Sequence, residues 1–348
     1  MFKINDRSGN VILLVFAATV IVAGIFLSTL NVFGIIGEKN PILIKEFKNN
    51  FEITDFTVNS KYAFLAYIEY DYEHDKKVPL NKGIKIFEIS DKSNPILISS
   101  CNTPGGANCL TVKDKYIFAA GKYLQIIDVS DIENPFITES MELSSEVFKI
   151  EIIKNKAYLS TANSLLLMDV SNSISPEVIG EFKANDAIKD FYIDNNYAFL
   201  ANWNNGAVIL DVSKEKIEKV SEYPGKIISS ISADEKYLYI LGNSLKVLDI
   251  TDISNPVFLK DIPVSGYSYD FDVDNDLVYL LSGSKSYSEQ YTGNLEIIKN
   301  HNTRDLKILA SNTFNLDVLE NLKMILKDNY AYISGEKNGL KIFKLVNI

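Results

Sequence analysis

The stretch Leu124–Pro135, which reads LQIIDVSDIENP, contains the pattern that decides the fold. Its first part is an apolar, β-branched run, which is typical of a strand, and it ends at an acid, a valine and a hydroxyl. An Asn-Pro pair follows. Because proline has no N–H to donate to a sheet, it belongs at the start of a strand or on an edge strand. The stretch therefore predicts a strand, a turn and the beginning of a second strand.

The same line recurs along the chain with a nearly constant period. Its clear copies are IKIFEIS (Ile84–Ser90), LQIIDVS (Leu124–Ser130), LLLMDVS (Leu165–Ser171), AVILDVS (Ala207–Ser213) and LKVLDIT (Leu245–Thr251). Two weaker copies, in which lysine replaces the acid, are LEIIK (Leu295–Lys299) and LKIFKLV (Leu340–Val346). The acidic position and its equivalents are 40, 41, 42, 38, 50 and 45 residues apart, so the chain has seven units.

Each unit has room for four short strands. Besides the two strands around the Asn-Pro turn, a unit contains a short strand such as Asp55–Val58, a tight polar turn and an aromatic strand such as Tyr62–Ala66. Repeated units of four alternating strands are typical of a β-propeller. The sequence therefore predicts an all-β, seven-bladed β-propeller.

The line L-x-I-I-D-V-S-D followed by N-P resembles the LVIVD repeat, which is assigned to β-propellers. The resemblance spans about residues 41–348, and it is strong in five units and weak in the last two. That family is associated with surface-exposed or anchored prokaryotic proteins, so the resemblance implies a place at the cell surface. It implies no particular activity, because propellers carry many different functions.

The first strand of the predicted propeller has no partner in its own unit. Residues 41–47 look like a strand of the Asn-Pro type, whereas the last strand, residues 340–346, is of the LQIID type. The strand count balances only if these two segments pair in the seventh blade. Such pairing removes free sheet edges, which favour aggregation. We therefore assign residues 37–348 to one closed propeller.

An uncharged segment precedes the propeller. Residues 11–37 contain no Asp, Glu, Lys or Arg, and about 20 apolar residues in a helix span a bilayer. We predict a short cytoplasmic tail over residues 1–10 and an uncleaved transmembrane signal anchor over residues 11–36. A cleaved signal peptide of unusual length is the alternative. The predicted location is the cell membrane, with a single pass and an extracytoplasmic propeller.

Two insertions and one tryptophan fall on the same face of the predicted disc. They are the long loops over residues 67–83 and 282–294 and the turn around Trp203, all opposite the Asn-Pro turns. We expect the Asn-Pro face to look toward the membrane and this face to look away from it. Exposed aromatic side chains on loops suit recognition of a protein or glycan, although such loops can also simply pack on the disc. The candidate binding residues are Tyr70, Tyr72, Trp203, Tyr287 and Tyr291.

Mostly polar residues start the predicted innermost strands, where they are expected to ring the mouth of the central channel. They are Asp55, Asn108, Lys149, Asp190, Ser230, Asp270 and Asn321. Converging oxygens can hold a cation or a ligand. The interpretation that we favour is structural, because Asn and Asp readily bond nearby backbone groups. By the same reasoning, the acids that end the LQIID strands, such as Asp128, are expected to cap turns.

Composition and motifs narrow the function. The net charge of −10 and the presence of only two arginines argue against nucleic acid as a partner. The sequence has no phosphate-binding loop, nucleophile elbow or zinc spacing, so we predict no catalytic residue, no metal and no cofactor. Cys101 and Cys109 can form a disulfide if the domain is exported, although their predicted strands are far apart.

The leading hypothesis is a membrane-anchored, extracytoplasmic propeller that binds a protein or glycan at the cell surface. One alternative is an enzyme, a lyase or hydrolase, that acts on surface polysaccharide through Asp55, Asp190 and Asp270 at the channel mouth. Another alternative is a structural scaffold of the cell envelope.

Overall fold

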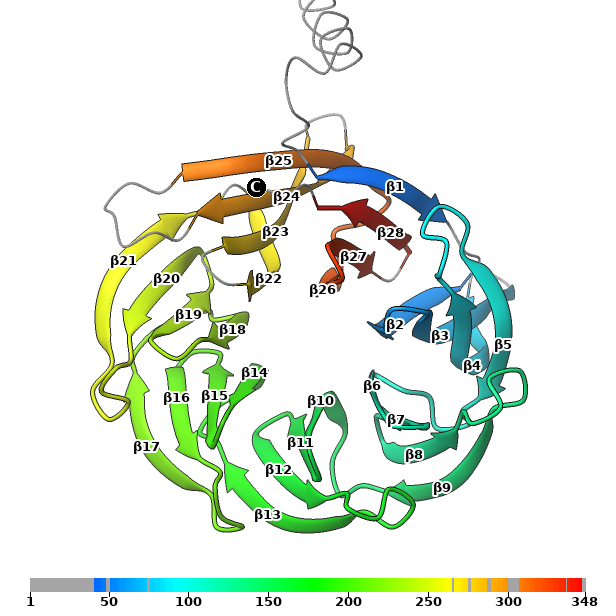
Figure 1. The fold of residues 1–348 in the computed structure, drawn as a ribbon, viewed down its shortest axis with the longest axis horizontal. Coiled ribbons are helices and arrows are strands. Elements are labelled where there is room, and N and C mark those ends of the chain that lie inside the picture. Colours follow the sequence, from blue (N-terminus) through cyan, green and yellow to red (C-terminus); the bar gives the residue numbers. More distant parts are fainter. Residues whose placement is uncertain are drawn as a thin grey trace, which may run out of the picture. The chain divides into compact units, whose positions relative to one another are not determined.

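The chain forms seven antiparallel sheets of four strands each, arranged as blades around a common axis (Figure 1). The computed structural model describes residues 41–47, 51–73, 76–264, 266–274, 277–286, 289–299, 307–335 and 337–345. The regular elements within these ranges are strands. The all-β, seven-bladed propeller that the repeats predicted is therefore confirmed.

The blades are meanders whose strands follow one another from the axis to the rim. Blades 1 to 3 consist of β2 (Glu52–Val58), β3 (Tyr62–Glu73), β4 (Lys76–Glu88) and β5 (Ile96–Asn102); β6 (Cys109–Lys113), β7 (Tyr116–Ala120), β8 (Tyr123–Asp128) and β9 (Phe136–Glu142); and β10 (Val147–Ile153), β11 (Lys156–Thr161), β12 (Ser164–Asp169) and β13 (Glu177–Lys183). Blades 4 to 6 consist of β14 (Ile188–Asp194), β15 (Tyr197–Asn202), β16 (Gly206–Asp211) and β17 (Glu218–Tyr223); β18 (Ser230–Ala233), β19 (Tyr237–Leu241), β20 (Ser244–Asp249) and β21 (Val257–Pro263); and β22 (Tyr267–Asp274), β23 (Leu277–Lys285), β24 (Tyr291–Lys299) and β25 (Lys307–Leu316). Blade 7 consists of β26 (Lys323–Lys327), β27 (Tyr330–Gly335), β28 (Gly339–Lys344) and β1 (Ile42–Phe47).

Blade 7 joins two segments from opposite ends of the sequence. Its outer strand β1 pairs antiparallel with β28, from Ile42 opposite Lys344 to Phe47 opposite Leu340. In Figure 1, β1 lies beside β28 at the top of the ring. The pairing closes the ring, because β1 supplies the fourth strand that β26, β27 and β28 lack.

The hydrophobic core is divided among the interfaces between blades. Seven buried clusters occur, and each combines side chains from two neighbouring blades. The cluster between blades 7 and 1, for example, contains Phe56, Leu65, Tyr332 and Ile342. This arrangement explains the long apolar runs of the middle strands, because both faces of a blade are covered by its neighbours.

The acids that end the LQIID-type strands cap the turns that follow. Oδ1 of Asp128 accepts a hydrogen bond of 2.7 Å from the backbone N–H of Ser130. Asp169, Asp211 and Asp249 accept the equivalent bond at 2.7 to 2.8 Å. Hydrogen bonds from the hydroxyl and the N–H of Ser130 lower the pKa of the Asp128 carboxyl. The predicted capping role is thus observed in four blades.

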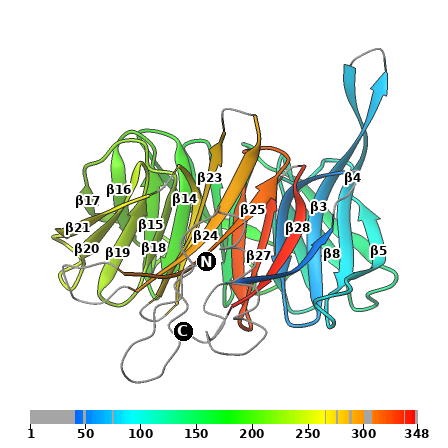
Figure 2. The same ribbon diagram turned by 90° about the horizontal axis from the view of Figure 1, so that it is seen from above.

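Two hairpins extend above one face of the disc (Figure 2). The predicted loops over residues 67–83 and 282–294 consist largely of strand: β3 pairs with β4 out to Glu73, and β23 with β24 well beyond the disc. The hairpin of β3 and β4 extends beyond the neighbouring strands of its blade. The pairing of β2 with β3 ends at Ile68, and the pairing of β5 with β4 ends at Gly83. The expectation of irregular loops was therefore wrong, because the inserted residues continue the alternating strand pattern and pair with each other.

No helix that could cross a membrane is found within the described residues. The predicted cytoplasmic tail (residues 1–10) and signal anchor (residues 11–36) lie outside them. Asn40–Val346 form a compact unit of their own.

Candidate binding site in the central channel

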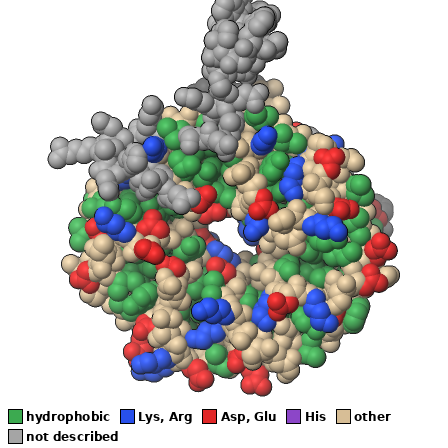
Figure 3. Space-filling model, viewed as in Figure 1, with side chains coloured by type: hydrophobic (Ala, Val, Ile, Leu, Met, Phe, Trp, Pro, Cys, Tyr) green, Lys and Arg blue, Asp and Glu red, His purple; other side chains and the backbone are tan. Residues whose placement is uncertain are grey.

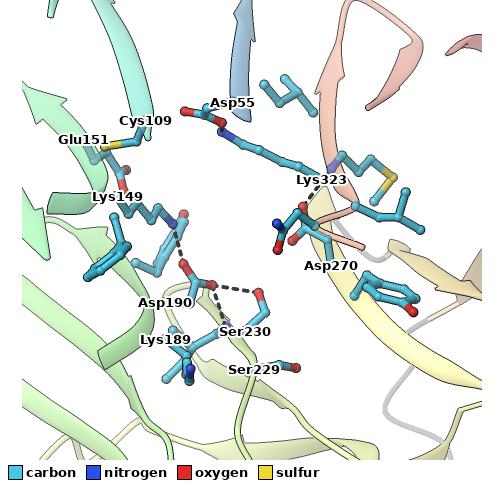
Figure 4. A pocket seen from close by; sticks show the side chains of 18 of the residues that line it. Asp55, Cys109, Lys149, Glu151, Lys189, Asp190, Ser229, Ser230, Asp270 and Lys323 are labelled. Carbon is cyan, nitrogen blue, oxygen red and sulfur yellow. Dashed lines mark hydrogen bonds and ion pairs between the residues drawn. The ribbon is translucent and has the colours of Figure 1, made fainter. Parts of the chain in front are cut away.

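A cavity of about 860 Å³ lies on the axis of the propeller. Its wall is formed by the innermost strands, and all seven residues of the predicted channel ring contribute to it. Figure 3 shows acidic and basic side chains around the opening, and Figure 4 shows Asp55, Lys149, Asp190 and Lys323 converging on it. The innermost strands start on the face that carries the two hairpins, so the predicted ring marks the mouth of the cavity on that face.

The strand register corrects the membership of this ring in two blades. Asp55 pairs with Ala66 on β3, and the residues in the equivalent position of blades 2 and 7 are Cys109 and Lys323. The predicted Asn108 and Asn321 precede these positions. Sequence reasoning missed Cys109 and Lys323 because it took the first polar residue of each unit. Aligning the hairpins by their turns would have found both residues.

The three aspartates of the ring connect neighbouring blades. Oδ2 of Asp55 accepts the backbone N–H of Leu110 in blade 2 at 2.8 Å. Oδ2 of Asp190 accepts the N–H of Ile231 in blade 5 at 3.0 Å, and Oδ2 of Asp270 accepts that of Met324 in blade 7 at 2.8 Å. Each aspartate thus bonds the innermost strand of the next blade. A buried backbone donor at each interface is satisfied in this way.

Two lysines also reach from their own blade to the next one, where each contacts the ring aspartate. Nζ of Lys149 in blade 3 lies 2.7 Å from Oδ1 of Asp190 and 2.6 Å from the carbonyl of Phe191. Nζ of Lys323 in blade 7 lies 2.5 Å from Oδ1 of Asp55 and 3.3 Å from the carbonyl of Phe56. Figure 4 shows both side chains reaching across the cavity wall.

The remaining two interfaces are bonded by neutral side chains. Between blades 2 and 3, Nδ2 of Asn108 donates to the carbonyl of Val147 at 3.1 Å. Between blades 5 and 6, the hydroxyl of Ser268 donates to the carbonyl of Gly242 at 2.5 Å. All seven interfaces therefore carry a polar link near the channel mouth, which is the structural role that we favoured for these residues.

A second layer of side chains lies deeper in the cavity. It includes Glu151, Tyr192 and Asp272, each two residues beyond a ring position. Burial raises the pKa of the Glu151 and Asp272 carboxyls. Burial would lower the pKa of Lys149, but the carboxylates of Asp190 and Glu151 outweigh it and raise this pKa. Lys149 is therefore a cation throughout the physiological pH range.

The carboxyl of Asp270 has a raised pKa. Burial is the main cause that raises its pKa to about 7, and the neighbouring Asp190 carboxylate contributes. The N–H of Met324 and the more distant cations Lys149 and Lys323 oppose this shift. Among the described residues, no lysine or arginine forms an ion pair with Asp270, in contrast to Asp55 and Asp190.

Trp203 lies near the rim of the cavity. Its turn between β15 and β16 is held by a 3.0 Å hydrogen bond from its backbone N–H to the carbonyl of Ala187. Its ring is 4.8 Å from Nζ of Lys189, which lines the cavity. Phe148, another lining residue, leaves 51% of its surface exposed. Aromatic groups thus flank the mouth at blades 3 and 4.

The predicted tyrosines lie elsewhere. Tyr70 and Tyr72 belong to the part of β3 that extends above the disc, and Tyr291 starts β24 and packs against the core between blades 6 and 7. Tyr287 lies outside the described residues. Tyr70 and Tyr291 are not among the residues that line the cavity, and their part in a binding rim stays a prediction.

Cys101 and Cys109 are both buried free thiols, and burial raises their pKa values. Within the described residues, no group of three or more His, Cys, Asp or Glu side chains is arranged to hold a metal ion.

Together, the closed ring and its axial cavity define a β-propeller with a polar central channel. The sequence model of the LVIVD repeat matches residues 79–103, 104–142, 188–215, 225–262 and 323–343. The protein therefore contains LVIVD repeats, as the resemblance implied. The matched segments include part of the seventh unit, which we expected to be weak, whereas the third unit (Leu165–Ser171) lies outside them.

Solved structures with the same fold share little sequence with this chain. The β-propeller domain of Myceliophteria thermophila Cps50 (Swd1) has a TM-score of 0.62 and 10% identity, with 88% of this chain and 100% of that chain covered. The WD40 β-propeller domain of Doa1 has a TM-score of 0.61 and 10% identity, with 89% and 98% covered. The computationally designed Ika8 protein has a TM-score of 0.55 and 10% identity, with 88% and 100% covered. These likenesses show the fold alone. No curated protein matches the sequence.

Proposed function

We propose that the protein is an interaction module, which binds a protein or glycan partner at the mouth of the central channel. The observation that carries the proposal is the polar cavity of about 860 Å³, whose mouth is flanked by the exposed Phe148 and by Trp203. Concave sites with a few polar groups and aromatic side chains at the edge are typical of ligand recognition. The rigid ring of interblade bonds holds these groups in place before a partner arrives, which lowers the entropic cost of binding.

The hydrogen bonds of the ring favour binding over the alternative of a polysaccharide-acting enzyme. That alternative assigns the chemistry to Asp55, Asp190 and Asp270 at the channel mouth. The carboxylates of Asp55 and Asp190 instead each accept a lysine ammonium and a backbone N–H of the next blade, which leaves Asp270 as the one carboxyl of the three without a lysine partner in the described residues. A general acid or base engaged in this way has little freedom to exchange a proton with a substrate.

We also propose, from the sequence, that residues 11–36 anchor the protein in the cell membrane and that the propeller lies outside the cytoplasm. The absence of charged residues from position 11 to 37 supports this. If the proposal holds, alkaline carbonate washing leaves the chain in the membrane fraction, and protease added to intact cells removes the propeller. Release by carbonate or full protection from protease would contradict it.

The binding proposal is tested with the full chain on arrays of immobilised peptides and cell-surface glycans. Phe148→Ala and Trp203→Ala are expected to reduce retention on the best array member at least tenfold. The matched control is Phe136→Ala, because Phe136 is similarly exposed but lies on the outer strand β9. Equal retention of all three variants would contradict a site at the channel mouth.

A further inference from the structure

Three blades of the propeller repeat one local arrangement on the innermost strand. In blades 1, 4 and 6, an aspartate at the ring position is followed by a phenylalanine: Asp55-Phe56, Asp190-Phe191 and Asp270-Phe271. In all three blades, Oδ2 of the aspartate accepts an N–H of the next blade. The carboxylates are therefore oriented alike, and Oδ1 is the oxygen left for a further partner.

In blades 1 and 4, this arrangement receives a primary ammonium group. Nζ of Lys149 contacts Oδ1 of Asp190 and the carbonyl of Phe191, and it lies 4.9 Å from the centre of the Phe191 ring. Nζ of Lys323 makes the same contacts in blade 1, 5.7 Å from the centre of the Phe56 ring. A carboxylate, a carbonyl and an aromatic face together form a favourable environment for an ammonium group.

Each of these lysines comes from the ring position of the preceding blade. Lys149 pairs with Ser160 on the next strand of its own blade, and Lys323 pairs with Ser334. The residue in that register position before blade 6 is Ser230, which pairs with Leu241. Its side chain is too short to reach Asp270, and its hydroxyl donates to Asp190 instead, at 2.7 Å. Within the part of the chain that the structure describes, no lysine therefore supplies an ammonium group to the arrangement in blade 6.

The third arrangement also faces the cavity. Ser230, Asp270 and Phe271 all line it, and Figure 4 shows Asp270 on the cavity wall on the strand next to Ser230. Oδ1 of Asp270 accepts the N–H of Phe271 at 2.9 Å, as Oδ1 of Asp190 accepts that of Phe191 at 2.8 Å. A ligand that enters from the channel mouth can therefore approach the same oxygen that a lysine of the chain approaches in the other two blades.

We propose that Asp270 and Phe271 form a receptor site for a primary ammonium group, namely the side chain of a lysine on the partner protein. The proposal rests on the function proposed above and names the group that the channel recognises. A lysine is favoured over an amino sugar because the two internal occupants are lysine side chains, whose aliphatic stems cross the cavity wall before the ammonium group reaches its contacts.

The test uses the full chain and two soluble probes. Nα-acetyl-lysine methylamide supplies the proposed side chain, and Nα-acetyl-norleucine methylamide is its counterpart without the ammonium group. We expect binding of the lysine probe at least tenfold tighter than that of the norleucine probe, as measured by calorimetry. Equal affinity for the two probes, or stronger binding of glucosamine than of the lysine probe, would overturn the proposal.

Two variants test the site from opposite directions. Asp270→Asn removes the negative charge and keeps an acceptor for the N–H of Met324, and Ser230→Lys gives the chain its own ammonium group in the register position of Lys149 and Lys323. Both variants are expected to bind the lysine probe at least tenfold more weakly than the parent protein does. The control Ser140→Lys adds the same charge on the exposed outer strand β9 and leaves the affinity unchanged. Unchanged affinity in both channel variants would refute the site.

The pH dependence gives a second readout. The carboxylate of Asp190 and the ammonium groups of Lys149 and Lys323 act electrostatically on Asp270, and Asp272 and Glu151 line the same cavity. Since a cation requires ionised Asp270, the affinity for the lysine probe should rise several-fold between pH 6 and pH 8, and Asp270→Asn should abolish the rise. If Phe148→Ala and Trp203→Ala weaken array binding but the lysine probe does not bind, this inference fails while the proposed function stands.

Discussion

Lys341 on β28 donates a 3.0 Å hydrogen bond to the Glu46 carboxylate on β1. An ion pair therefore joins the first and the last strand of the chain within blade 7. The Lys341 side chain is only 2% exposed, and its ammonium group also donates to the carbonyl of Asn338 at 3.1 Å. Removing one partner of a buried pair leaves an uncompensated charge, which costs more than the pair contributes.

We therefore expect Glu46→Gln to lower the free energy of unfolding by about 1–2 kcal/mol, measured by urea denaturation. The control is Glu218→Gln, which breaks the solvent-exposed pair between Lys216 and Glu218 and should leave the midpoint unchanged. If Glu46→Gln unfolds at the same urea concentration as the parent protein, the ion pair has no role in closing the ring.

Asp190 connects more of the ring than Asp55 or Asp270. Its carboxylate accepts the ammonium group of Lys149, the hydroxyl of Ser230 and the backbone N–H groups of Phe191 and Ile231. Asp190→Ala leaves these donors without their acceptor, so we expect a loss of about 3 kcal/mol in the free energy of unfolding. Asp270→Ala removes the acceptor of two backbone N–H groups, those of Phe271 and Met324, so it should cost less under the same conditions. The reverse order would contradict the assignment.

Asp270 should make stability depend on pH in an unusual direction. Its pKa is raised from 3.8 to about 7, so between these values the folded state binds more protons than the unfolded state. The free energy of unfolding then falls as pH rises from about 4 to about 7, by on the order of 3 kcal/mol from this group. Asp270→Asn should remove that part of the slope. The stability of the variant relative to the parent protein should therefore be greater at pH 8 than at pH 5. Parallel pH profiles for the two proteins would contradict the shift.

The turn cap at Asp128 should contribute measurably to its blade. The carboxylate accepts both the N–H and the hydroxyl of Ser130. Asp128→Ala is expected to lower the free energy of unfolding by about 1 kcal/mol, whereas Asp128→Asn, which keeps one acceptor oxygen, should lower it less. Chemical denaturation of both variants measures the difference, and equal losses would argue that packing rather than the cap is responsible.

The hairpin of β3 and β4 should be dispensable for folding. Beyond Ile68 and Gly83 its two strands pair only with each other, and such an isolated pair adds little stability. Replacing residues 70–80 by Asn-Gly should leave the thermal midpoint within about 2 °C of that of the parent chain, since only a change of about 1 kcal/mol or more would move it further. A larger drop would show that the hairpin supports the disc. Binding of the deleted chain to the arrays tests whether Tyr70 and Tyr72 take part in recognition.

The repeat pattern predicted the fold because it records a local rule. A strand such as Leu124–Asp128 needs apolar side chains on both faces, a capping acid at its end and proline only after the turn, and each unit repeats these requirements. The same reasoning predicted that the channel mouth would be polar and that its side chains would bond neighbouring blades. It did not identify Cys109 or Lys323 as ring residues, because their register depends on how each hairpin pairs.

Local pattern therefore specified the number of blades, the order of strands within them and the need for an outer strand in the last blade. Three features depend on distances between different blades: the pairing of Lys149 with Asp190, the lack of a lysine partner for Asp270 among the described residues, and the raised pKa of the Asp270 carboxyl. Such distances are not encoded in any one repeat, because they arise only when seven blades close around a common axis and bring residues far apart in the chain to one cavity wall.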